Sequence, residues 1–142
     1  MVRPMFFFVL FLALLAVLGL GFVGYVRLAP SDPARWHVDP LTTSDPSTPN
    51  FARVDRVVAM PPEAVAEAIA TRARAEDARL LAGDADFGTW IARSALMRYP
   101  DYVTIRLLPE GDGTRIVAFS RARFGVGDHG VNRARLRRWL PQ

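Results

Sequence analysis

The chain has 142 residues, 51% of them hydrophobic, and a formal net charge of +4 at pH 7. It contains no cysteine, which excludes disulfides, Cys-ligated metal centres, thiol nucleophiles and a lipidated N-terminal cysteine. All 18 basic residues are arginine, so lysine Schiff-base chemistry and the lysine-dependent phosphate sites of kinases and P-loop proteins are excluded as well.

The N-terminal segment predicts a membrane anchor over residues 1–27. Met5–Val26 is a run of 22 residues without a charge, flanked by Arg3 and Arg27. About 20 apolar residues span a bilayer core. A cleaved signal peptide is the alternative, but its apolar region is roughly 7–15 residues long and ends at a small-x-small site. This run is longer and no such site follows it, which favours an uncleaved signal anchor.

The orientation of the anchor follows from weaker signals. The charges on the two sides of the run are nearly balanced, so the positive-inside rule does not decide the topology. Short N-terminal anchors commonly leave the N-terminus in the cytoplasm, and the arginine-only, alanine-rich composition suggests a GC-rich bacterial genome. We therefore expect a single-pass protein of the bacterial cytoplasmic (inner) membrane, with its C-terminal domain in the periplasm.

Residues 28–50 are predicted to form a proline-rich linker. Prolines fix φ and lack an N–H donor, so we expect neither a helix nor an internal strand here. In polyproline geometry, at ~3.1 Å per residue, such a spacer reaches ~70 Å. Trp36 is atypical of a spacer and either docks on the domain or lies in the lipid interface, whereas His37 is expected to be an ordinary exposed imidazole.

Residues 51–142 predict a small α+β domain. Pro61-Pro62-Glu63 starts a helix after the first strand, and a second helix packs across an antiparallel sheet near the C-terminus. A five-residue loop, Pro109–Gly113, joins the last two strands. The predicted strands are Ala52–Met60, Arg79–Ala82, Phe87–Met97, Tyr102–Leu108 and Thr114–Phe124, and the final helix is Gly130–Leu140.

The last strand has the clearest alternation of the domain. One face carries Ile116, Ala118, Ser120, Ala122 and Phe124, and the other carries Arg115, Val117, Phe119, Arg121 and Arg123. Residues 115–142 hold seven Arg and one Asp. Solvated arginines explain this charge better than a nucleic-acid site does, and we expect no nucleic-acid partner. Attraction to acidic lipid head groups or to an acidic protein remains open.

The segment Gly125–Gly130 spells G-x-G-x-x-G but fails as a dinucleotide-binding fingerprint. That motif needs a further parallel strand and an acidic residue about 20 positions later, and the chain ends before either. A turn, with Asp128 capping the last helix, is favoured. The alternative is an anion site made of backbone N–H groups and Arg121 or Arg123.

No other motif indicates catalysis, a metal or a cofactor. Asp84-x-Asp86-x-Gly88 resembles the start of a calcium loop, but Ala95 stands where the twelfth position requires Glu, so a loop-tip role is favoured. Asp128-His129 with Ser120 does not form a triad, because chain neighbours rarely make the Asp–His hydrogen bond that a triad needs.

The stretch from Ser120 to Leu140 resembles a signature of the bacterial and plastid family catalogued as domain of unknown function 1499. The similarity covers about residues 50–140 and leaves out the anchor and linker, and Ala122 stands where Ser is usual. Tyr99-Pro100-Asp101-Tyr102-Val103 is similar to the family's upstream Pro-Asp segment. The matching residues include Arg121, Arg123, Gly125, Asp128, Gly130, Asn132 and Arg135. The resemblance implies no known activity.

The signature residues allow two interpretations. The favoured one is a structural network in which Asp128 pairs with an arginine and a buried Asn132 holds the turn. The other is an anionic-ligand site, because Arg121, Arg123 and Arg135 outnumber Asp128.

We therefore expect a non-catalytic, membrane-tethered module that binds a membrane partner protein or a lipid-like or anionic ligand. One alternative is an accessory subunit of a larger membrane complex, held through Met5–Val26, where Gly19, Gly21 and Gly24 allow close helix approach. The other is a membrane-surface hydrolase that uses His129.

Overall fold

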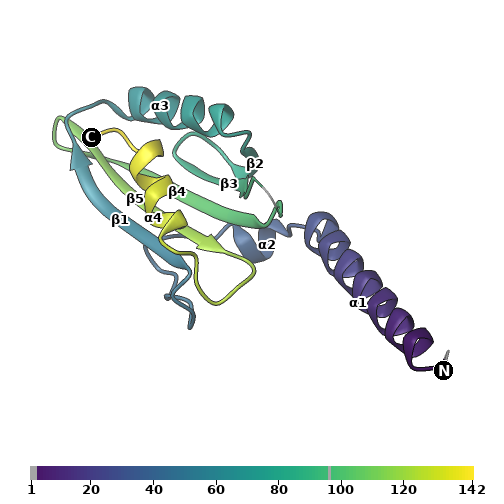
Figure 1. Ribbon diagram of the computed structural model, residues 1–142. Coiled ribbons are helices and arrows are strands. Elements are labelled where there is room, and N and C mark those ends of the chain that lie inside the picture. The colour runs from purple at the N-terminus through teal and green to yellow at the C-terminus, as the bar shows by residue number, and fades with distance from the viewer. Residues whose placement is uncertain (1–2, 96) are drawn as a thin grey trace.

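The computed structural model describes residues 3–95 and 97–142. A long N-terminal helix extends away from a small α+β domain, as Figure 1 shows. The elements are α1 (Arg3–Leu28), α2 (Pro33–Trp36), β1 (Phe51–Val58), α3 (Pro62–Ala75), β2 (Arg79–Gly83), β3 (Phe87–Arg93), β4 (Pro100–Glu110), β5 (Gly113–Ala122) and α4 (Val131–Trp139).

The five strands form one antiparallel sheet in the order β1-β5-β4-β3-β2. The predicted α+β class, with a helix after the first strand and a C-terminal helix on the sheet, is confirmed. The five-residue loop is wrong: Glu110 pairs with Gly113, so only Gly111 and Asp112 form the turn. Gly111 has φ +58°, which suits the two-residue turns that match strand twist.

Helices α3 and α4 cover one face of the sheet (Figure 1). The main core lies between these two helices and the sheet. Val65, Ile69 and Ala73 follow one another at helical spacing and form the buried stripe of α3. From α4, Leu136 and Trp139 are buried against the sheet. On β5, the face that carries Ile116, Ala118 and Ser120 is buried, and Val117 and Phe119 on the other face are buried as well.

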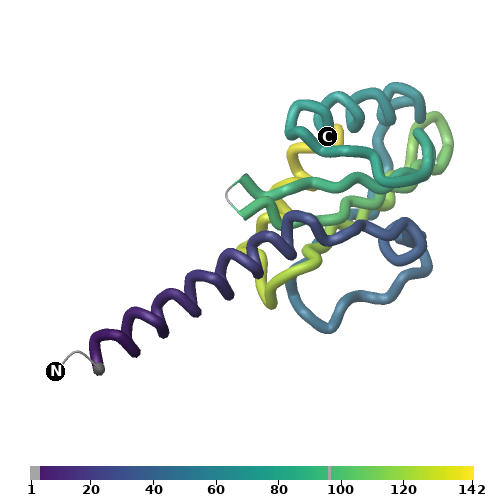
Figure 2. Tube along the Cα trace, turned by 90° about the vertical axis from the view of Figure 1, so that its right-hand side faces the viewer, coloured from purple at the N-terminus to yellow at the C-terminus, as the bar shows by residue number. Residues whose placement is uncertain are grey.

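The opposite face of the sheet is covered by the segment between α1 and β1. Figure 2 shows this segment (blue) on the side of the strands away from α3. Trp36 is buried and stacks on Tyr102 with 3.9 Å between ring centroids, and Asp39 forms an ion pair with Arg106. Ser31 also forms a hydrogen bond with the Tyr102 hydroxyl, at 2.8 Å. Residues of the proline-rich segment are therefore packed on the sheet.

Two expectations for this segment are wrong. Pro33–Trp36 forms a short helix, because the Asp32 carboxylate accepts a hydrogen bond from the Ala34 N–H and Pro33 occupies the first helical position, where it needs no donor. His37 is half-buried rather than fully exposed: its Nδ1 lies 2.9 Å from the Thr89 hydroxyl and its ring stacks on Phe87.

The helix α1 is long and apolar enough to cross a membrane, over Pro4–Leu28, with a mean hydropathy of 2.9. Its apolar side chains are largely exposed, whereas Val26, at its domain end, is buried. The Tyr25 ring lies edge-on to Phe124, 5.9 Å away. This helix is therefore a candidate anchor, and its orientation, compartment and retention stay predictions.

Candidate functional site

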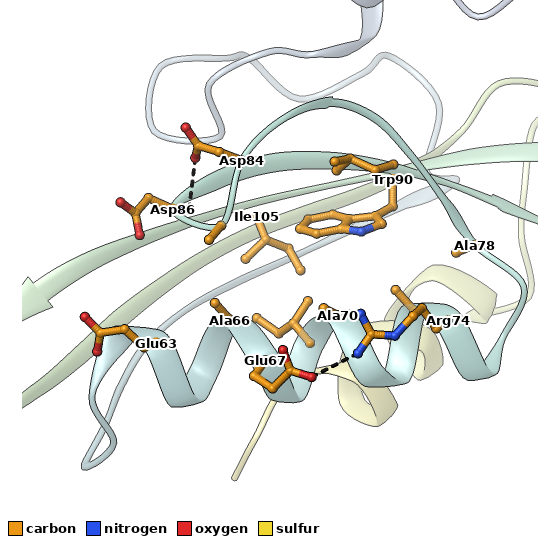
Figure 3. Close-up of a pocket in the computed structure, with 14 residues that line it drawn as sticks. Glu63, Ala66, Glu67, Ala70, Arg74, Ala78, Asp84, Asp86, Trp90 and Ile105 are labelled. Carbon is orange, nitrogen blue, oxygen red and sulfur yellow. Dashed lines mark hydrogen bonds and ion pairs between the residues drawn. The ribbon is translucent and has the colours of Figure 1, made fainter.

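A pocket of about 490 Å³ lies between α3 and the β2–β3–β4 side of the sheet. Its walls are mainly apolar, with Trp90 of β3 and Ile105 of β4 facing the helix (Figure 3). Ligand sites in proteins are concave, mostly apolar and of this size class. The other lining residues are Glu63, Ala66, Glu67, Ile69, Ala70, Ala73, Arg74, Ala78, Leu80, Asp84, Ala85 and Asp86.

The pocket exists because α3 presents small side chains to this part of the sheet. Ala66, Ala70 and Ala73 follow one another at i, i+4 and i+7, so their methyl groups lie along one side of the helix. The indole of Trp90 stands opposite them and packs against the core, where it lies edge-on to Trp139. A large side chain on one side and methyl groups on the other leave open volume between helix and sheet.

The rim of the pocket is acidic. Glu63 and Glu67 stand on α3, and Asp84 and Asp86 stand on the β2–β3 connection, on the other side of the opening (Figure 3). Arg74 lines the pocket as its one basic residue and pairs with Glu67, Nη2 to Oε1, at 2.9 Å. Among the described residues, the other three carboxylates form no ion pair, so their negative charges can attract a ligand at the opening.

The rim residues are held by local structure. Asp84 accepts hydrogen bonds from the backbone N–H groups of Asp86 and Phe87, each at 3.0 Å, and this closes a turn at the end of β2. Gly83 precedes the turn with φ +89°, a conformation that favours glycine. The predicted loop-tip role of Asp84 is therefore confirmed, and the side chain serves the backbone while remaining on the rim.

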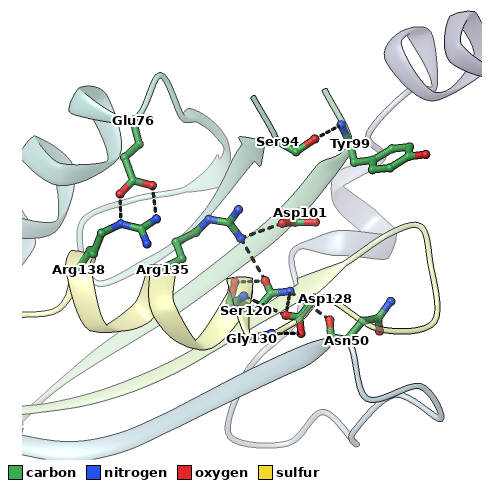
Figure 4. A network of polar contacts seen from close by, with 11 residues as sticks. Asn50, Glu76, Ser94, Tyr99, Asp101, Ser120, Asp128, Gly130, Arg135 and Arg138 are labelled. Atoms are coloured by element: carbon green, nitrogen blue, oxygen red, sulfur yellow. Dashed lines mark hydrogen bonds and ion pairs between the residues drawn. The ribbon is translucent and has the colours of Figure 1, made fainter. Parts of the chain in front are cut away.

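The C-terminal part of the signature forms a buried network between α4 and the sheet (Figure 4). Arg135 Nη1 lies 2.9 Å from Asp101 Oδ2, and both side chains are less than a tenth exposed. Fully buried Asn132 accepts hydrogen bonds from Ser120 and Arg135 and donates to the Asn50 carbonyl and to Asp128. The expectation of a buried, hydrogen-bonded Asn132 is confirmed.

Asp128 does not pair with an arginine in the described part of the chain. Its carboxylate accepts hydrogen bonds from the backbone N–H groups of Gly130 and Asn132 and thereby caps α4. Partial burial raises the pKa of Asp128, but these hydrogen bonds outweigh it and hold the pKa below its ordinary value. The expected Asp128–arginine pair is wrong, because Arg135 extends from the middle of α4 toward Asp101 on β4.

In the buried pair, Asp101 neutralises the charge of Arg135, so this arginine is not available to bind an anionic ligand. Burial raises the pKa of Asp101, and the adjacent Arg135 guanidinium opposes the rise. Because Arg135 is closed off by the sheet and bonded to protein oxygens, its charge does not face a ligand-accessible surface. Asp101 lies in the Pro-Asp segment of the sequence, and no residue pattern near it indicates Arg135 as its partner.

Arg121 and Arg123 lie on the other face of the sheet and do not join this network. Arg121 lies over the Trp36 ring, 4.8 Å from its centroid, and Arg123 donates a 2.8 Å hydrogen bond to the Pro30 carbonyl. Burial, followed by the neighbouring charges of Arg35 and Arg53, lowers the pKa of Arg121. These two arginines fasten the segment before β1 to the sheet.

The glycine-bearing stretch forms the connection between β5 and α4. Gly125 and Gly130 have φ of +89° and +80°, and the Gly125 carbonyl accepts a hydrogen bond from the Asn50 side chain at 2.6 Å. His129 is exposed, and buried Ser120 donates its hydroxyl hydrogen to Asn132. The predicted signature residues are thus divided between the two faces of the sheet, and the three arginines do not converge.

Of the comparisons with known proteins, the family model agrees with the resemblance seen in the sequence. The profile described as Protein of unknown function (DUF1499) matches residues 29–142. The match begins before the expected start near residue 50 and includes the segment packed on the sheet. The chain is similar to the crystal structure of TTHA0849 from Thermus thermophilus, with 20% identity, a TM-score of 0.32 and coverage of 61% of this chain and 81% of that chain. No curated protein matches. Because the profile spans most of its length, the chain belongs to the DUF1499 family of proteins of unknown function.

Proposed function

We propose that the protein is a non-catalytic, membrane-anchored binding module whose pocket beneath α3 holds the apolar part of an amphiphile. The observation that carries the proposal is the apolar pocket of about 490 Å³ with an acidic opening. Apolar surface around Trp90, Ile105 and the alanines of α3 favours a hydrocarbon-like body, because its transfer out of water is favourable.

The rim charges select the polar end of the ligand. Glu63, Asp84 and Asp86 add negative potential at the opening, and Glu67 is balanced by Arg74. An anionic end group placed there meets like charges, whereas an amine or another hydrogen-bond donor meets acceptors. The proposed ligand is therefore an amphiphile with a cationic or donor-bearing end, rather than the anionic ligand considered from the sequence.

The proposed anchor places the pocket close to a membrane. In this proposal α1 lies in a bacterial cytoplasmic membrane and holds the domain at the periplasmic surface, where amphiphiles are concentrated. The apolar side chains along α1 are not covered by the domain. This exposure supports insertion in a membrane, because an apolar surface of this extent is unfavourable in water.

A second candidate is an accessory subunit that joins a larger membrane complex through α1. A Cβ added at Gly19, Gly21 or Gly24 meets no atom within 4 Å beyond its chain neighbours and the adjacent helix backbone, so all three sites are open to a neighbouring helix. Replacing Met5–Val26 by an unrelated anchor is expected to abolish association with such a complex. Association that survives the replacement contradicts this second candidate.

Photolabelling of the full-length protein tests the pocket directly. A diazirine-bearing dodecylamine is photolysed with the protein in phosphatidylcholine nanodiscs, and the labelled peptides are mapped by mass spectrometry. We expect adducts on α3 and on the Trp90 peptide. The matched diazirine dodecanoate, which differs in its end group, is expected to label these peptides several-fold less.

Two alanine substitutions on α3 provide the matched control. Ala70→Phe places a ring in the pocket, whereas Ala75→Phe adds the same volume at an exposed position outside it. Labelling should fall in the first variant and persist in the second. Labelling confined to α1, or unchanged by Ala70→Phe, contradicts the proposal.

A further inference from the structure

Arginines gather where α1 meets the domain. Arg27 stands in the last turn of α1, Arg93 is the last residue of β3, and Arg98 lies in the connection from β3 to β4. With Ala95 they line an open hollow of about 520 Å³. Figures 1 and 2 both show the domain end of α1 beside this connection. The hollow is separate from the pocket beneath α3, because the two share no lining residue.

The charges around this hollow are poorly neutralised. Arg93 donates to the carbonyl of Arg98, and Arg123, which is nearby, donates to the carbonyl of Pro30. In the described part of the chain, the one carboxylate paired with any of these arginines is that of Asp77, 3.5 Å from Arg98, and its side chain is 88% exposed. An ion pair this exposed contributes little.

Burial and the neighbouring arginines both act on the charge of Arg93. Burial, followed by repulsion from Arg98 and more weakly from Arg79 and Arg123, lowers the pKa of Arg93 below its ordinary value. These positive charges repel one another, and an anion bound among them reduces the repulsion.

Aromatic side chains contact one another at the domain end of α1. The Phe124 ring contacts both Tyr25 and Tyr99, at centroid distances of 5.9 and 6.0 Å. Leu28 and Val126 are 84% and 72% exposed. Tyrosines at the end of a membrane helix lie at the level of the lipid head groups. If α1 spans a membrane as proposed, arginines beside these tyrosines lie at the depth of the lipid phosphates.

We infer that the hollow lined by Arg27, Arg93 and Arg98 binds the head group of an anionic phospholipid in the leaflet that α1 enters. Planar guanidinium groups donate paired hydrogen bonds to phosphate oxygens. A phosphocholine head group has the same phosphodiester but adds a cation that the arginine charges repel, so a head group with a net negative charge is favoured. This inference rests on the proposed insertion of α1 in a membrane. Such a contact fixes how the domain, with its α3 pocket, sits on the bilayer.

Lipid retention by the full-length protein tests the inference. The protein is assembled in nanodiscs of equal phosphatidylcholine and phosphatidylglycerol, released, and weighed with its bound lipids by native mass spectrometry. We expect retention of phosphatidylglycerol over phosphatidylcholine, and Arg93→Gln/Arg98→Gln should lower this preference on the order of tenfold. Arg27→Gln lies outside the domain fold and should lower it as well. The control Arg133→Gln/Arg137→Gln removes the same charge from exposed positions on α4 and should leave it unchanged.

The contradicting outcomes are distinct. Equal retention of the two lipids, or an unchanged preference in both hollow variants, overturns the inference alone. Retention of inorganic phosphate by the hollow arginines, with no phosphatidylglycerol retained, assigns the hollow to a soluble anion and overturns the choice of a phospholipid. Failure of the chain to insert into nanodiscs overturns the proposed anchor, and the inference falls with it.

Discussion

The buried pair between Arg135 and Asp101 predicts a large loss of stability when one charge is removed. Asp101→Asn keeps the size of the side chain but leaves the Arg135 guanidinium, 5% exposed, without a counter-charge. Removing one partner of a buried pair costs about 3–5 kcal/mol. For a domain of this size, at roughly 4–8 °C per kcal/mol, that loss lowers Tm by ~12–40 °C. Thermal unfolding of the full-length protein in mild detergent, followed by near-UV circular dichroism, measures the effect.

The exposed ion pair between Arg115 and Asp55 provides the control for Asp101→Asn. Arg115 and Asp55 make two hydrogen bonds at 2.8 and 2.7 Å across β1 and β5, but both side chains are well exposed. Asp55→Asn should therefore change Tm little. Replacing the buried pair with leucines at both positions should recover part of the stability lost in Asp101→Asn. Equal Tm values for Asp55→Asn and Asp101→Asn refute the assignment of Asp101 to the interior.

Three further predictions concern α4 and the segment before β1. The hydrogen bond from Arg138 lowers the pKa of Glu76 and outweighs the opposite effect of burial. The Glu76–Arg138 interaction therefore stabilises the fold above pH ~4.3, and this stabilisation is lost as the pH falls through the folded-state pKa of Glu76. Denaturant unfolding over a pH series should show this acid loss in the wild type and less of it in Glu76→Gln; identical profiles contradict it. Trp36→Ala removes the stack on Tyr102 and should cost about 3–5 kcal/mol in the same assay, and a neutral result means the segment is not docked. Asp128→Ala removes the cap of α4 and should cost about 0.5–2 kcal/mol, whereas Asp128→Asn should retain most of it.

The local pattern of the sequence predicts the strands and the two longer helices of the domain, but not which residues they bring together. Alternation along the last strand places Phe119 and Arg121 on one face and Ser120 on the other, because side chains of a strand point to opposite sides whatever the fold. The partner of Arg135 is Asp101, which lies far earlier in the chain. Strand pairing brings Asp101 opposite Ala122, and no sequence spacing encodes that register.

The proline-rich segment departs from its prediction for a different reason. The number of prolines predicts an unstructured spacer, yet Asp32-Pro33 is itself a helix start signal with a cap and a favourable first residue. Trp36 is atypical of a spacer, but its docking site, the Tyr102 ring, becomes available only when β4 is placed in the middle of the sheet.

The pocket beneath α3 is not predicted by the sequence. The alanines of α3 indicate a helix that packs closely, and close packing normally leaves no space. The volume arises because Trp90 holds the opposite wall, and that position depends on the register of β3 with β4, where Trp90 pairs with Val103. A run of alanines at i, i+4 and i+7 on a helix facing a tryptophan is the one available signal.

Native mass spectrometry of the full-length protein, extracted gently from its own membrane, tests the central claim most directly. The wild type and the Ala75→Phe control are expected to carry a small amphiphile as a defined additional mass, and Ala70→Phe, which fills the pocket, is expected to lose it. A bare chain in all three preparations, or an additional mass that Ala70→Phe retains undiminished, contradicts the binding role of the pocket.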